Sequence, residues 1–385
     1  MIHLAAFLLA FVIAATVPAV LITLALIPWR RLPDEPWTER ARRFNSIRVG
    51  HASWLLVLPF AAMIGRLWFM PTASLPAILV GVVLGSTLAS WPMDRALFPT
   101  YRIRNWLAST VVLSLMQLGW VFLALLFALL MPDTLSFAQL GWVIGFLVAT
   151  GSLSAGLIYY LLVIVGALKP AGERLTRLVQ ACAAEAGIPV KSVWEISTPA
   201  GYAAALVVQR ALVFSTATAA EHDDEELRAI CRHELAHLKE GPGLIALRVA
   251  QLPVTMLPFI FIPTAMTALG PLGILVPLLV WILLQRLFAR ISLRLEKRAD
   301  DAARQGTESP AYARALERLH RRNLMPAVLA PNTARTHPDL YDRMIAAGVT
   351  PDSPRPAPPE KHHWLPVSAQ LLGGATMLGW LLYWD

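Results

Sequence analysis

Two histidines four residues apart are the feature of this chain with the clearest chemistry. His233 and His237 stand in the stretch Cys-Arg-His-Glu-Leu-Ala-His. Residues four apart lie on one face of an α-helix, so both imidazoles can bind a single Zn²⁺ ion. Glu234 points about a quarter of a turn away, where its carboxylate can take a proton from an attacking water. This H-E-x-x-H pattern indicates peptide hydrolysis, although the pentapeptide occurs by chance in roughly one chain in a hundred.

A catalytic zinc site needs a third protein ligand, and the charged stretch at 289–300 offers one. Glu296 is the candidate, because the composition of the stretch favours a helix. Asp300 lies one turn further on the same face, where it can accept a hydrogen bond from a ligand histidine and fix its tautomer. The alternative is an ordinary charged helix beside a membrane span.

Glu296 can meet the two histidines only if the apolar block at 247–288 returns to the same side of the membrane. The block has about forty residues, which at 1.5 Å per residue is enough for two crossings of roughly 30 Å. Gly270-Pro271 falls near its middle, where a turn is expected. A shared site requires this even number of crossings.

The composition is typical of a membrane protein. Of 385 residues, 56% are hydrophobic and only 15% are charged, against about a quarter charged in soluble domains. Apolar runs long enough to cross a bilayer explain the difference, since each crossing needs about 20 helical residues. We expect about eight spans, near Ala5–Ile27, Trp54–Met70, Leu75–Trp91, Trp106–Met131, Leu140–Ala167, Leu247–Leu269, Leu272–Phe288 and Leu365–Trp384.

The distribution of the net charge of +8 predicts an orientation. The loops at 71–74, 132–139 and 270–271 contain no Lys or Arg, whereas the alternate loops are rich in Arg. This positive-inside pattern places both chain ends outside and the H-E-x-x-H region in the cytoplasm, as in a multi-pass bacterial inner-membrane protein. Nucleic acid is not expected as a partner, because no pattern of aromatic and basic residues accompanies the charge.

The order of polar and apolar stretches predicts a mainly α fold, a polytopic membrane helical bundle with a small α+β zincin-type catalytic domain on the cytoplasmic side. The expected parts are a bundle of about five spans at 1–168, a catalytic insert at 169–246, a membrane hairpin at 247–288, a helical segment at 289–350, a proline-rich linker at 351–364 and a last span at 365–385. The two cysteines, Cys182 and Cys231, lack a C-x-x-C spacing and are expected to pack as small apolar side chains in a reducing compartment.

The catalytic insert is predicted to hold a helix, three short strands and then the H-E-x-x-H helix. The helix is expected at 171–186, and the strands at 192–196, 202–208 and 211–215. The H-E-x-x-H helix should begin beside Asp223, which can form a cap with Glu226, and run through Lys239. The charged residues beside the motif exclude it from a membrane span, which disfavours an intramembrane protease.

These motifs resemble the HtpX and CAAX prenyl protease family of membrane zinc metallopeptidases. The resemblance covers roughly residues 169–346. It rests first on His-Glu-Leu-Ala-His, followed by a membrane hairpin and Glu-Lys-Arg-Ala-Asp. Three further stretches are similar: Tyr202–Thr216, Asp224–Gly241, and the late Thr-His-Pro…Arg segment that ends at Arg343.

The resemblance implies a role for each residue of the motifs. His233, His237 and Glu296 would be the ligands of one Zn²⁺ per chain, Glu234 the general base, and Asp300 a support for a ligand. One departure stands out: the family has Asn-Ala-Phe/Tyr before its edge strand, whereas this chain has Ala-Gly-Tyr at 200–202. This departure implies altered handling of substrate without loss of hydrolysis.

Three further residues have two interpretations each. His337 can stabilise a transition-state oxyanion or belong to a local His-Pro structural element. Arg343 can do the same or form a structural salt bridge. Tyr202, in the stretch Tyr202–Val208, can contact an extended substrate added as a strand, or this stretch can be an internal strand of the sheet.

The sequence therefore favours a membrane-embedded zinc metalloendopeptidase that hydrolyses membrane or membrane-proximal proteins at the cytoplasmic face. One alternative is a sensor protease of a regulatory pathway, although the outside loops are too short for a ligand-binding domain. The other is a non-enzymatic scaffold with a vestigial metal site, which has no need of Glu234. Oligomeric state is left open.

Overall fold

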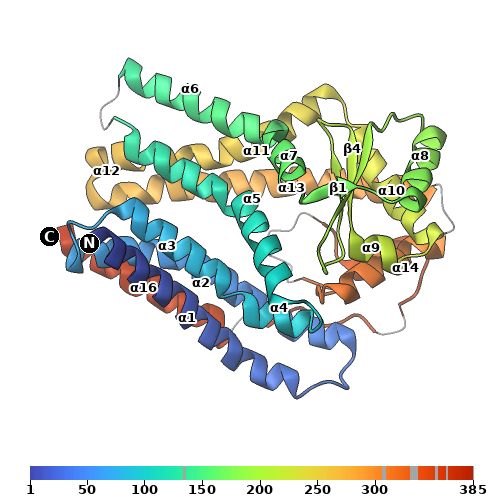
Figure 1. Cartoon of the computed structure of the whole chain (residues 1–385), viewed down its shortest axis with the longest axis horizontal. Helices are drawn as coiled ribbons and strands as arrows, with labels where there is room; N and C mark the ends of the chain where they lie inside the picture. Colours follow the sequence, from blue (N-terminus) through green and yellow to red (C-terminus); the bar gives the residue numbers. More distant parts are fainter. Residues whose placement is uncertain (133–135, 306–308, 330–336, 352–353, 361–362, 385) are drawn as a thin grey trace. The chain divides into compact units, whose positions relative to one another are not determined.

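The computed structural model describes the chain except for residues 133–135, 306–308, 330–336, 352–353, 361–362 and 385 (Figure 1). The chain is mostly helical, with one small sheet, as predicted. It divides into two compact units. One comprises Met1–Ser114, Asn323–Ala330 and Arg355–Asp385, and the other Leu115–Arg322 and Pro331–Pro354.

The first unit is a bundle of long apolar helices. Its helices are α1 (Ile2–Arg30), α2 (Trp37–Phe69), α3 (Leu75–Leu88), α4 (Trp91–Leu97) and α16 (Trp364–Trp384). Close contact of α1 with α3 depends on two glycines: a Cβ on Gly81 would lie 2.6 Å from the carbonyl oxygen of Phe7, and one on Gly85 would lie 2.4 Å from that of Phe11. Small residues at such crossings let two helix backbones approach in a membrane.

The second unit joins further membrane helices to the catalytic insert. Its apolar elements are α6 (Phe137–Ser152), the π-helix η1 (Leu153–Leu157), α7 (Ile158–Ile164), α11 (Pro242–Ile260), α12 (Ile262–Leu269), the 3₁₀ turn η2 (Gly270–Ile274) and α13 (Leu275–Gln305). The turn expected at Gly270-Pro271 is therefore present. The sequence predicted a membrane span followed by a separate charged helix. Instead, α13 runs unbroken from the apolar stretch through Glu296 and Asp300. The apolar part and the charged part therefore form one rigid helix.

Seven helical stretches among the described residues are long and apolar enough to cross a membrane: Ile2–Arg30, Trp37–Phe69, Leu75–Leu97, Phe137–Ile164, Pro242–Leu269, Leu272–Arg304 and Trp364–Tyr383. Each contains or overlaps one of the predicted spans. The remaining prediction, near Trp106–Met131, falls on α5 (Ile103–Leu130), many of whose side chains lie outside the described residues.

The insert folds around a four-stranded sheet with the order β1-β2-β4-β3. The strands are β1 (Leu168–Pro170), β2 (Ser192–Ile196), β3 (Ala203–Leu206) and β4 (Ala211–Ser215). β2 pairs with β4 in parallel, while β1 and β3 are the antiparallel outer strands. β2 and β4 occupy the predicted residues, β3 is shorter than predicted, and the three-residue β1 was missed because it is too short to show an alternating pattern.

The helices of the insert pack on this sheet and on each other. They are α8 (Glu173–Ala186), α9 (Thr216–Glu221), α10 (Asp224–Leu238), α14 (Ser309–Arg322) and α15 (Leu340–Ala346). Their shared core includes Val179 of α8, Leu212 and Phe214 of β4, and Leu227 of α10, all fully buried. This core fixes α10 against the sheet, and α13 packs against α10 from another side.

Candidate metal centre

The helix that carries the H-E-x-x-H motif begins where the sequence predicts. The backbone N–H of Glu226 donates to Oδ1 of Asp223 at 2.8 Å, and Oε2 of Glu226 accepts from the N–H of Asp223 at 3.3 Å. This reciprocal capping box satisfies two N–H groups that the first turn would otherwise leave unpaired. The helix ends at Leu238, one residue before the predicted end, with Lys239 as its C-terminal cap.

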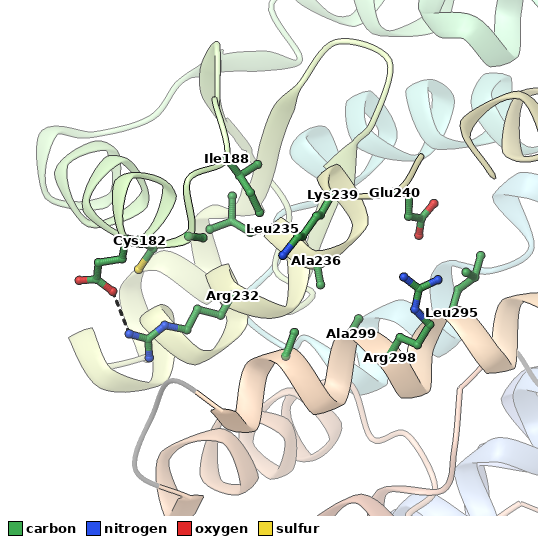
Figure 2. A pocket seen from close by; sticks show the side chains of 13 residues that line it. Cys182, Ile188, Arg232, Leu235, Ala236, Lys239, Glu240, Leu295, Arg298 and Ala299 are labelled. Carbon is green, nitrogen blue, oxygen red and sulfur yellow. Dashed lines mark hydrogen bonds and ion pairs between the residues drawn. The ribbon is translucent and has the colours of Figure 1, made fainter. Parts of the chain in front are cut away.

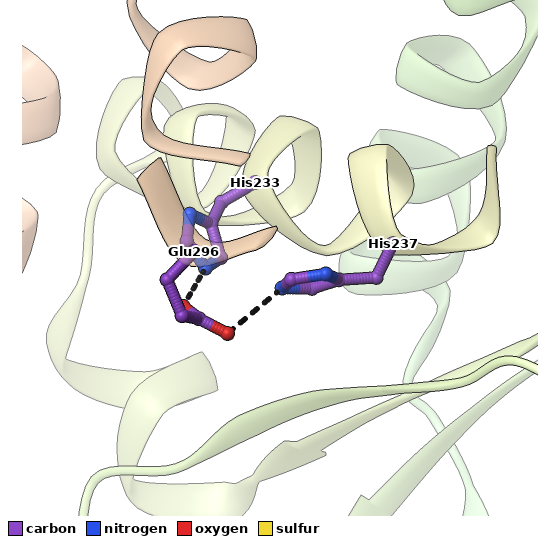
Figure 3. Close-up of side chains that lie close together, drawn as sticks. All are labelled: His233, His237 and Glu296. Carbon is purple, nitrogen blue, oxygen red and sulfur yellow. Dashed lines mark ion pairs between the residues drawn. The ribbon is translucent and has the colours of Figure 1, made fainter. Parts of the chain in front are cut away.

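Two histidines of α10 and one glutamate of α13 converge on one point (Figure 3). Nε2 of His233 lies 3.3 Å from Oε2 of Glu296, and Nε2 of His237 lies 3.4 Å from Oε1 of Glu296. The three residues are 7–8% exposed. The predicted meeting of these residues across the hairpin is therefore present in the structure.

These distances fit a tetrahedral metal ion. Ligand atoms at about 2.0 Å from zinc in a tetrahedral site lie about 3.3 Å from one another. Oε2 of Glu296 is buried and forms no hydrogen bond among the described residues, although imidazole nitrogens face it. An unsatisfied buried carboxylate oxygen is costly unless a cation neutralises it. The donor set of two imidazoles and a carboxylate is also one that catalytic zinc uses.

His233 is supported from behind by a carboxylate. Its Nδ1 lies 3.2 Å from Oδ1 of Asp300, which is 5% exposed. An Nδ1–H bond to Asp300 leaves the lone pair of Nε2 directed at the metal position. Burial alone would lower the pKa of His233, but hydrogen bonds with Asp300 and Glu296 outweigh it and raise the pKa to about 9.

Asp300 is itself held by two buried side chains. Arg343 donates from Nε to Oδ2 at 2.9 Å and from Nη2 to Oδ1 at 2.6 Å. The hydroxyl of Tyr312 donates to Asp300 and accepts from Arg343 at 2.8 Å. This geometry favours the structural salt bridge for Arg343 over contact with substrate. Tyr312, on α14, was not predicted, because nothing in its spacing relates it to the motif.

His237 has its own supporting carboxylate, which the sequence reasoning also missed. Nδ1 of His237 lies 3.1 Å from Oε1 of Glu240, three residues on. Arg248 of α11 donates to both oxygens of Glu240 at 2.6 Å. Burial opposes ionisation of Glu240, yet hydrogen bonds from Arg248 and His237 lower its pKa to about 2. In the sequence this glutamate indicates a polar helix, and its i+3 position beside a predicted ligand is a further signal of a supporting role.

The remaining predicted residues surround this centre. Glu234 is 8% exposed on α10. His337 places Nδ1 2.8 Å from Oε2 of Glu296 and is half exposed. Tyr202 precedes β3, with its backbone N–H bonded to the hydroxyls of Ser215 and Thr218. Tyr202 is 48% exposed, and with partial removal from water and Glu234 nearby the pKa of its phenol lies above the ordinary value, so the phenol remains a hydrogen-bond donor.

Comparison with known proteins identifies a related family and a related fold. Residues 171–348 match the model of peptidase family M48. The crystal structure of Ste24p from S. mikatae is similar over 89% of this chain and 99% of that chain, with a TM-score of 0.56 and 14% sequence identity, a likeness of fold. No curated protein matches the chain. The resemblance to HtpX and CAAX protease-like proteins is confirmed, and these matches support an integral multi-pass membrane metallopeptidase.

Proposed function

We propose that this chain is a zinc-dependent metalloendopeptidase that hydrolyses membrane or membrane-proximal proteins at the cytoplasmic face of a bacterial inner membrane. The observation that carries the proposal is the convergence of two imidazole nitrogens, from His233 and His237, on the buried carboxylate of Glu296 at 3.3–3.4 Å. A metal ion with an open coordination position fits there, and Glu234 is next to it in the sequence.

In this proposal the residues divide the chemistry between them. A Zn²⁺ ion at the site would polarise the scissile carbonyl and lower the pKa of the attacking water toward neutrality. Glu234 accepts the proton of that water and passes it to the leaving amine. Tyr202, as a protonated phenol, and His337, half exposed beside Glu296, would donate hydrogen bonds to the oxyanion that develops in the transition state.

The sheet suggests how a peptide is held. β3 is an outer strand, paired on one side with β4 and in contact with α10. An outer strand leaves backbone N–H and C=O groups available to an extended peptide, which can bind as an additional strand. Such a peptide would run past Tyr202 toward Glu234. This supports the strand-addition alternative for Tyr202–Val208 over an internal strand.

The position of the site along the chain bears on the substrate. α11, an apolar helix long enough to cross a membrane, begins at Pro242, five residues after His237. α13 brings Glu296 to the site from the second half of the hairpin. The active site therefore lies near the membrane surface, where peptide segments next to membrane spans are the most accessible substrates. The basic loops support the cytoplasmic side.

One comparison tests the proposal. The full chain, purified in detergent, is incubated with an unfolded protein, alongside Glu234→Gln and the control Glu225→Gln, an exposed position in the first turn of the same helix. We expect cleavage by the wild type and Glu225→Gln, loss on addition of a chelator, and a decrease of about 10²-fold to 10⁴-fold in Glu234→Gln with zinc retained. Equal, chelator-insensitive cleavage by all three proteins would refute the proposal.

A further inference from the structure

A cavity of about 560 Å³ lies beside the metal centre, on a neighbouring face of the same helix. Residues of α8, α10 and α13 line it (Figure 2). On α10 it takes the positions Arg232, Leu235, Ala236 and Lys239, which share one helical face. The ligand histidines lie on the adjacent face, so the cavity is separate from the proposed active site.

The cavity combines an apolar wall with an excess of positive charge. Ile188, Leu235 and Leu295 supply the apolar wall. Three cations line the cavity, namely Arg232, Lys239 and Arg298, together with two carboxylates, Glu185 and Glu240.

The carboxylates are already neutralised by other residues. Arg232 donates to Glu185 at 2.9 Å, and Glu240 is bound by Arg248 at 2.6 Å. In the part of the chain that the structure describes, neither Lys239 nor Arg298 forms an ion pair, and both are exposed. Two positive charges therefore remain available to a ligand, one on each of the two helices that flank the cavity.

The cavity also lies close to the membrane surface. Lys239 is three residues before α11, and Arg298 is ten residues beyond Phe288, about 15 Å along α13 from the end of its apolar stretch. Side chains on a helix lean toward its N-terminus, which in α13 is the membrane end. The guanidinium of Arg298 is therefore directed back toward the bilayer.

A row of cations continues from the cavity to the membrane. Arg286, Arg290 and Arg294 precede Arg298 at intervals of four residues on α13, and all four are exposed. Exposed Leu279, Ile282 and Leu283 precede this row. Apolar residues followed by a basic stripe are typical of a helix that leaves the bilayer through anionic headgroups.

We propose that this cavity binds the phosphate headgroup of an anionic phospholipid. Lys239 and Arg298 contact the phosphate from two helices, and the apolar wall contacts the upper part of the acyl chains. A free phosphate or a soluble anion would use the two charges but gain nothing from the apolar wall or from the neighbouring bilayer. The proposal does not depend on hydrolysis, because neither Lys239 nor Arg298 is a proposed metal ligand; Glu240, which supports His237, also lines the cavity but is already bound by Arg248.

Native mass spectrometry of the full chain in detergent can test this. The probes are short-chain phosphatidylglycerol, short-chain phosphatidylcholine and inorganic phosphate. The proteins are the wild type, the double variant Lys239→Gln/Arg298→Gln, the stripe variant Arg286→Gln/Arg290→Gln, and the control Arg177→Gln, an exposed cation on α8 outside the cavity. Zinc content and thermal unfolding of each variant show whether it folds.

We expect the wild type to bind phosphatidylglycerol more tightly than phosphatidylcholine, and the cavity double variant to lose about 10-fold to 30-fold in affinity for it. Arg177→Gln should bind phosphatidylglycerol as tightly as the wild type does. The stripe variant should lose less affinity for this lipid than the cavity variant does. Unchanged binding by a folded cavity variant, or an equal loss in the stripe variant, would overturn the proposal. Competition by inorganic phosphate as strong as that of the lipid would point to a soluble anion and overturn it as well.

Discussion

Nδ1 of His237 lies 3.1 Å from Oε1 of Glu240, as Nδ1 of His233 lies 3.2 Å from Oδ1 of Asp300. The two imidazoles thus have the same arrangement, with Nε2 toward Glu296 and Nδ1 toward a buried carboxylate. Each carboxylate is in turn bound by an arginine, Arg248 or Arg343. This repeated pattern holds both ligand rings in place, and with a metal on Nε2 it favours the tautomer with the proton on Nδ1.

Replacing Glu240 should therefore weaken metal binding without removing a ligand. We expect Glu240→Gln to bind zinc about 10-fold to 100-fold more weakly, since an amide supports the Nδ1–H less well than a carboxylate does. Competition with a chromophoric chelator measures the affinity. Glu225→Gln, on the same helix and exposed, should bind zinc as the wild type does. Wild-type affinity in Glu240→Gln would show that this contact does not position His237.

Replacing Asp300 should affect stability as well as metal binding. Arg343 is 7% exposed, and Asp300→Ala leaves its charge buried without a counterion. Loss of one partner of a buried pair costs about 3–5 kcal/mol. Thermal unfolding in detergent should show a much lower midpoint for Asp300→Ala and a smaller decrease for Tyr312→Phe, which loses one neutral group. Similar midpoints for the wild type and Asp300→Ala would contradict this account of the ion pair.

The sequence predicted the parts of the site that follow a regular spacing. His233 and His237 are related by one helical turn, and the capping residues Asp223 and Glu226 by three positions, so both relations can be seen in the chain itself. The pairing of Glu296 with the histidines was also predictable, because the length of the apolar block fixed an even number of crossings. β2 and β4 were predictable because both are rich in Val, Ile, Leu or aromatic residues.

Apart from Glu240, which is three residues from His237, the residues that were missed meet only through tertiary packing. Tyr312 reaches Asp300 from α14, and Arg248 reaches Glu240 from within an apolar helix, where its charge suggested no particular partner. Cys182 and Cys231, far apart in the sequence, are both fully buried in the core between α8 and α10. The cavity beside α10 likewise depends on how three helices pack, and no local pattern of residues reports that packing.

The return of the chain through the membrane can be tested by labelling. Single cysteines at Leu272, exposed in η2, and at Arg177, exposed on α8, should lie on opposite sides of the membrane. We expect a membrane-impermeant thiol reagent to label Leu272→Cys in intact cells and Arg177→Cys only after lysis. The native cysteines are fully buried, so their background should be low. Labelling of both positions from outside would place the active site on the other face.

Tyr202 offers a test of the proposed oxyanion contact. We expect Tyr202→Phe to lower kcat by about 10-fold or more with little change in KM, because the lost hydrogen bond forms mainly in the transition state. Zinc affinity should be unchanged, since Tyr202 is not a ligand. Steady-state kinetics on a fluorogenic peptide would measure both constants. A rise in KM at constant kcat would instead indicate that Tyr202 only binds substrate.

The most direct measurement is X-ray absorption at the zinc edge on the zinc-loaded chain, compared with Glu296→Ala. A single zinc bound by two imidazole nitrogens at about 2.0–2.1 Å and a carboxylate oxygen, with the oxygen contribution altered in Glu296→Ala, is the result that we predict. An unchanged spectrum in the variant, or a zinc environment containing sulfur or only one imidazole, would contradict the joint binding of one metal by α10 and α13.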